Sequence, residues 1–84
     1  MTEKELIERL ADAEHDSWAR WMQWLFSTCK VNEDKSMTIP APLVERWMRQ
    51  AYTIYDDLSE EEKHSDRNEV MHILPIIKEF ANRQ

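Results

Sequence analysis

The sequence contains no glycine at all, only three prolines and a single cysteine. Without glycine the chain cannot form the glycine-rich loops that cradle phosphates, and its composition is typical of a helical protein. The lone Cys29 excludes an internal disulfide framework and fits the reducing environment of the cytoplasm.

Long apolar runs and an excess of positive charge are also absent. No uninterrupted apolar stretch approaches the ~18 residues of a membrane span, and the charged segment MTEKELIERL lacks the apolar region of a signal peptide. The net charge is −6, which disfavours DNA or RNA because polynucleotide binding depends on Lys and Arg neutralising phosphates. We therefore expect a cytoplasmic protein with neither a membrane nor a polynucleotide partner.

Tryptophan is what the sequence has in abundance, with four in 84 residues, three of them in the stretch AEHDSWARWMQWLF. A fully buried tryptophan removes about 150–250 Å² from water, which is worth at most roughly 4–6 kcal/mol. The length predicts one domain over residues 1–84 with a modest core. We assign Trp21, Trp24 and Leu25 to that core. For Trp18, which shares a helix face with His15, both a core position and a ligand-facing position remain open.

Apolar periodicity predicts a long helix over residues 2–29, begun by Thr2 and Glu5 at capping-box spacing. Beyond residue 17 apolar residues occupy more of the helix circumference, so we expect this part of the helix to be covered on more than one side. Residues 30–41 break the period, and we expect a short irregular or extended segment there without a real sheet.

Two further helices are predicted. The first begins near Pro42 and ends near Tyr52, with inward residues Leu43, Val44, Trp47, Met48 and Ala51. The second is capped by Ser59 with Glu62 three residues later, and Pro75 should kink or split it. Its apolar stripe is expected to be Val70, Leu74, Ile77 and Ala81. The fold class is therefore all-α, a compact three- to four-helix domain.

Two segments, AEHDSW at 13–18 and YDDLSEEEKHSDR at 55–67, resemble the RyR domain, the small repeat of ryanodine receptors. The resemblance lies in His-x-x-Trp, then Tyr-x-x-Leu, then Lys-x-x-Asp-Arg ending at Arg67. The family's Gly-Trp-x-Tyr-Gly and His-Pro segments are absent. In their place, SMTIPAPLVERWMRQAY is similar to segments of short phage and prophage proteins.

The resemblance implies a non-catalytic module with a helical fold. In receptors such a domain serves interaction and regulation, whereas its bacterial and phage relatives imply binding of a nucleotide-derived messenger. A phage version would sequester that messenger in the host cytoplasm as an anti-defence protein.

Aromatic rings beside cations are the pattern that could hold such a ligand, since rings stack on bases and guanidinium groups bind phosphate. Each cation also has a simpler interpretation as part of a solvated helix face, and Lys63 and Asp66 could form structural ion pairs. For Tyr55, packing in the core or between helices is favoured over contact with a ligand. The candidate ligand-binding residues are His15, Trp18, Arg46, Arg49, Tyr55, Lys63 and Arg67.

No catalytic or metal site is expected. Cys29 and His15 would lie about 21 Å apart along one helix, too far to couple, and no His-x-x-x-His pattern is present. We therefore expect no enzyme activity and no cofactor. The leading hypothesis is a module that binds a nucleotide-derived ligand. The alternative is a helical protein-interaction or self-assembling protein without a small ligand, and both are compatible with a homo-oligomer.

Overall fold

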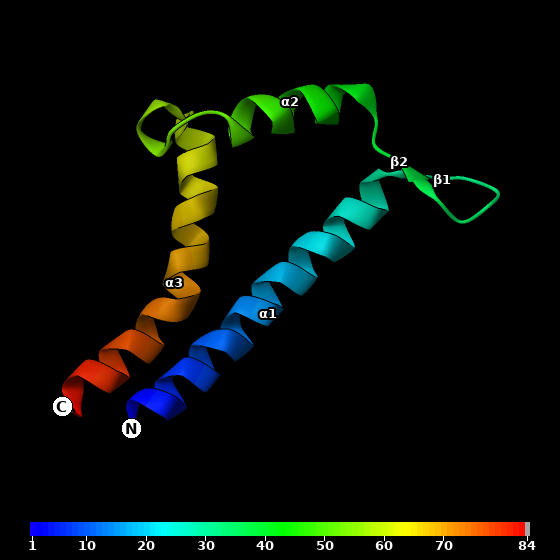
Figure 1. The fold of residues 1–84 in the computed structure, drawn as a ribbon. Helices are drawn as coiled ribbons and strands as arrows, with labels where there is room; N and C mark the ends of the chain where they lie inside the picture. Colours follow the sequence, from blue (N-terminus) through cyan, green and yellow to red (C-terminus); the bar gives the residue numbers. More distant parts are fainter. Residues whose placement is uncertain (84) are drawn as a thin grey trace.

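The computed structural model describes residues 1–83 as three helices, a short hairpin and a 3-10 turn (Figure 1). In chain order the elements are α1 (Glu3–Thr28), β1 (Lys30–Val31), β2 (Met37–Thr38), α2 (Ala41–Ala51), η1 (Tyr55–Asp57) and α3 (Glu60–Asn82). The mainly helical fold class is confirmed. No helix within residues 1–83 combines the length and apolar character needed to cross a bilayer.

Both predicted N-terminal capping residues, Thr2 and Ser59, begin their helices. The Thr2 hydroxyl accepts a hydrogen bond from the Glu5 N–H at 3.1 Å at the start of α1. At the start of α3 the Ser59 hydroxyl accepts from the Glu62 N–H, and the Glu62 carboxylate accepts from the Ser59 N–H, each at 3.2 Å. These bonds satisfy backbone donors that have no partner in the first turn of a helix.

The segment between α1 and α2 forms a small antiparallel hairpin, so the expectation of no sheet is wrong at this point. Lys30 pairs with Thr38 and Val31 with Met37. The Asp34 carboxylate accepts from both the N–H and the hydroxyl of Ser36. The bond from the Ser36 hydroxyl lowers the pKa of Asp34. These side-chain bonds close a turn that strand pairing alone would leave marginal.

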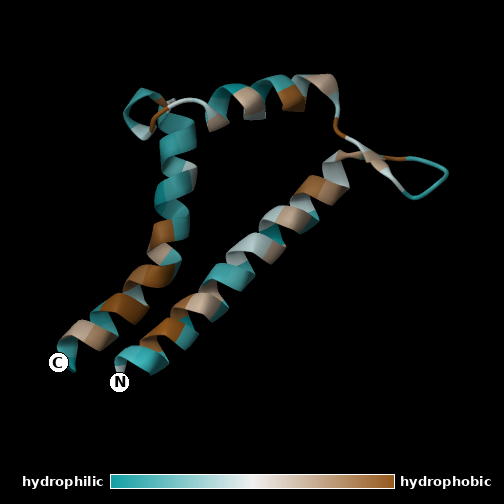
Figure 2. Ribbon diagram, viewed as in Figure 1, coloured by the Kyte–Doolittle hydropathy of each residue, from teal (hydrophilic) through white to brown (hydrophobic). Residues whose placement is uncertain are grey.

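The two long helices run antiparallel, with the start of α1 beside the end of α3, and α2 crosses the end where they diverge (Figure 1). Pro75 lies inside α3 and does not split it. The apolar residues of α3 gather in its C-terminal half, which lies beside α1, whereas its first half is hydrophilic (Figure 2). The chain therefore folds as a frame whose two long sides meet at one end.

The frame is one helix thick. Its extents are 52 × 34 × 16 Å and its radius of gyration is 16.9 Å, whereas a compact chain of this length has a radius of about 12 Å. The shortest extent is about a third of the longest, and α1 and α3 are the one pair of helices in residues 1–83 with extensive contact, so the three helices lie roughly in one plane. The predicted compact domain is wrong because these helices pack side by side in a plane.

Burial follows from this shape. Among residues 1–83 no hydrophobic side chain is buried. Trp21 and Trp24, assigned to the core from the sequence, are both exposed, and Leu25 is half-buried. The residues predicted to point inward that are also exposed include Val44, Met48, Ala51, Val70, Ile77 and Ala81. These predictions of burial are wrong because a helix in a single layer contacts neighbouring helices only within the plane of the layer. Its two other faces stay open to solvent.

Candidate functional site

Three tryptophans tie α2 to the second half of α1. The Trp47 ring lies 5.6 Å from the rings of both Trp21 and Trp24, measured between centroids, and those two lie 6.2 Å apart. Tilted and edge-on pairs at such distances are favourable beyond simple area burial. The stretch quoted from the sequence thus contributes two rings to packing, although neither ring is covered completely.

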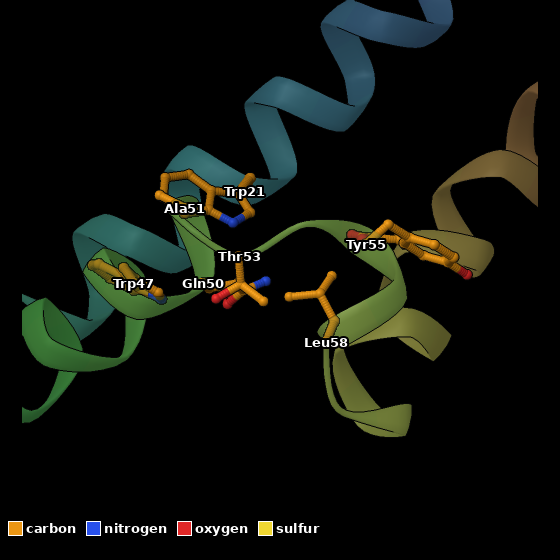
Figure 3. Close-up of a pocket in the computed structure, with 8 residues that line it drawn as sticks. Trp21, Trp47, Gln50, Ala51, Thr53, Tyr55 and Leu58 are labelled. Atoms are coloured by element: carbon orange, nitrogen blue, oxygen red, sulfur yellow. The ribbon is translucent and has the colours of Figure 1, made fainter.

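A hollow of about 550 Å³ opens between α1, α2 and the connector before α3 (Figure 3). Trp21, Trp47 and Leu58 line it together with Tyr55, and Asp66 is the one charged side chain among its lining residues. No cation faces this hollow. It therefore offers apolar and aromatic contacts but no clamp for a phosphate.

The candidate cations from the RyR-like segment gather at the start of α3, beside Tyr55. The Lys63 Nζ lies 5.7 Å from the centroid of the Tyr55 ring, and Lys63 and Arg67 both pair with Glu60, at 3.8 and 3.4 Å. Attraction to Tyr55, followed by the hydrogen bond to Glu60, raises the pKa of Arg67. Lys63 thus forms an ion pair within α3, as its structural interpretation allowed, and its partner is Glu60. We call Tyr55, Lys63 and Arg67 the α3 corner.

Arg49 has a structural partner. Its guanidinium donates to the Glu62 carboxylate at 3.0 Å, and Glu62 is the only buried residue in the described chain, with 4% exposure. The hydrogen bond from Arg49 lowers the pKa of Glu62, followed by the bond from Ser59. Arg49 thus compensates a buried carboxylate and links α2 to α3. Arg46, one turn earlier, is exposed.

The His15 and Trp18 rings form a pair of their own on α1, with centroids 5.9 Å apart and planes inclined by 30°. Neither residue lines the hollows that contain Tyr55 or Arg67. The structure therefore divides the candidate site from the sequence into two parts. One is the pair on α1 and the other is the α3 corner.

Polar contacts that the sequence did not predict join α1 to α3. The Ser17 hydroxyl donates to Glu69 at 2.5 Å, and Arg20 pairs with the same carboxylate at 3.2 Å. The Ser17 bond is the main cause of the lowered pKa of Glu69. Nearer the chain ends Arg9 pairs with Glu79 and lowers the pKa of that carboxylate. The residues of each pair are about 50 to 70 positions apart in the sequence, so helical spacing could not predict these contacts.

Within residues 1–83 no group of three or more histidine, cysteine and acidic side chains is arranged to hold a metal ion. Comparisons of the chain with protein-family models, curated proteins and solved structures found no match.

Proposed function

We propose that this protein is a non-catalytic, self-assembling helical interaction module of the cytoplasm. The observation that carries the proposal is the single layer of helices without one buried hydrophobic side chain in the described residues. Stable domains bury the apolar faces of their helices between at least two packed layers. The missing layer has to come from another molecule.

The amount of exposed surface supports self-assembly. The chain exposes 6987 Å², whereas a compact monomer of 10.2 kDa exposes about 5,300 Å². The excess of about 1,700 Å² exceeds the roughly 800 Å² that each partner buries in a standard interface. One further copy of the chain would provide enough apolar surface to cover it.

Light scattering coupled to size-exclusion chromatography tests the proposal. We expect a mass of at least two chains at micromolar concentration, because the isolated layer cannot offset the conformational entropy of folding. A folded protein that remains strictly monomeric across the accessible concentration range would refute self-assembly.

A second candidate function is binding of a nucleotide-derived anion, as the RyR-like segments suggest. The observation that favours it is the α3 corner, where two cations stand beside an aromatic ring. A second hollow of about 550 Å³ lies next to it, lined by Tyr55, Arg67, Val70 and Met71 together with Asp66. A base could stack on the tyrosine while a phosphate meets Arg67. Glu60 would have to give up its ion pair with Arg67, which weakens this candidate.

A thermal-shift screen with cyclic nucleotides, ADP-ribose and mononucleotides tests this second function. A ligand at 100 times its dissociation constant stabilises the folded state by about 2.7 kcal/mol, or about 10 °C for a chain of this size. We expect Arg67→Ala to abolish the shift and Arg46→Ala, an exposed residue in the middle of α2, to preserve it. A shift unaffected by Arg67→Ala would exclude the α3 corner as the site.

A further inference from the structure

The layer formed by α1 and α3 has two unlike faces. On one face a hollow between the helices is lined by Arg9, Asp12, Asp16 and Arg20 of α1, with His72 of α3. On the other face the corresponding hollow is lined by Glu14 and Ser17 of α1 and by Glu69, Val70 and Ile73 of α3, and Ala13 and His72 border both hollows. Charged side chains therefore line one face, and a more apolar surface forms on the other.

Helical periodicity extends the second surface along both helices. Ile7 and Trp18 lie seven residues before and four residues after Glu14, so they share its side of α1. Ile77 lies seven residues after Val70 and shares its side of α3. All four are exposed in the single chain, at 56% for Ile7, 57% for Trp18, 53% for Val70 and 43% for Ile77. We call these four residues the apolar face.

We infer that a second copy of this chain packs on the apolar face, so that two α1/α3 pairs form a four-helix bundle centred near Trp18. This inference rests on the proposed self-assembly and specifies its surface. An isologous interface requires only that one patch fit itself across a two-fold axis. Antiparallel helix pairs with apolar stripes meet this requirement in bundles. The excess exposed surface of about 1,700 Å² is larger than the roughly 800 Å² that each partner contributes to a standard interface.

The bundle explains why Trp18 differs from its neighbours. Trp21 and Trp24 contact Trp47 within the chain, whereas the ring contact of Trp18 is with His15, on its own helix. A large exposed aromatic ring at the centre of an apolar face is the usual anchor of a protein interface.

Three lysine substitutions test the surface by sedimentation equilibrium of the full chain. Trp18→Lys and Val70→Lys should each raise the dimer dissociation constant about a hundredfold, as loss of an interface anchor does. Asp16→Lys, which puts the same side chain on the charged face, should leave it within about threefold, the range of a surface substitution. Trp18→Phe keeps an aromatic ring and should retain the dimer.

The outcomes separate this inference from the proposed function. A wild-type dimer that both Trp18→Lys and Val70→Lys leave intact would overturn the apolar face as the interface and preserve self-assembly. A dimer weakened only by Asp16→Lys would place the interface on the charged face. A monomeric wild-type chain would overturn self-assembly itself.

Discussion

A thousandfold dilution of the protein, from about 100 μM to about 0.1 μM, is expected to lower its melting temperature by about 10 °C. When folding and assembly are one transition, the free energy of unfolding contains the logarithm of the protein concentration. A thousandfold change is worth about 4 kcal/mol per dimer, or about 2 kcal/mol per chain. Intrinsic tryptophan fluorescence can follow the transition at the lower concentration.

In this experiment the buffer and the ionic strength stay fixed, and only the protein concentration changes. A melting temperature that does not move would mean that each chain unfolds independently. In that case the single layer would be stable alone, contrary to the ordinary requirement for a two-layered interior.

The second large effect is expected from Trp47→Ala, which we predict to destabilise the protein by about 3 kcal/mol. Removal of a core tryptophan costs about 3–5 kcal/mol, and the half-buried Trp47 belongs at the lower end of that range. The ring contacts both Trp21 and Trp24 at 5.6 Å, so its loss should release α2 from α1. Urea unfolding monitored by circular dichroism at constant protein concentration measures the change.

Tyr52→Ala is the matched control, since Tyr52 directly follows α2 and is 85% exposed. Its substitution should alter stability by less than about 0.5 kcal/mol. The Trp47→Ala protein should still assemble, because the apolar face lies on α1 and α3. Equal stability of the two variants would show that the tryptophan cluster does not hold α2 in place.

Local signals were the part of the fold that the sequence predicted well. Thr2 and Ser59 begin their helices as their spacing indicated, because capping involves residues only three positions apart. Pro75 lies inside a continuous helix, so it does not split α3, and α3 changes direction about halfway along its length (Figure 1). The hairpin was missed because hydrogen bonds donated by Ser36 to the Asp34 carboxylate stabilise strands too short to give a pattern.

Burial was predicted poorly because it depends on which surfaces meet. Periodicity showed that Trp21 and Trp24 lie on an apolar side of a helix, but not whether anything covers that side. The apolar residues around α1 beyond residue 17 predicted coverage on more than one side, but Trp18, Trp21, Trp24 and Phe26 are all exposed. Glu62 was recognised as a capping residue, yet its burial depends on Arg49, which α2 brings from 13 positions away.

The candidate site shows the same limit. Tyr55, Lys63 and Arg67 come together because they lie within one connector and the helix that follows it. His15 and Trp18 pair for the same reason, as neighbours on α1. The hollows lined by Tyr55 and Arg67 contain neither His15 nor Trp18. A sequence motif could not predict this separation, because it gives no information about the distance between α1 and α3.

The single layer of helices also affects the steady-state amount of this protein in a cell. A chain without a partner exposes its apolar face and is the form that proteases and chaperones recognise. Below the dissociation constant, newly made chains would be degraded nearly as fast as they appear, whereas above it they survive as pairs. Abundance would then depend on the rate of synthesis as a threshold, and the protein would be either nearly absent or present in quantity.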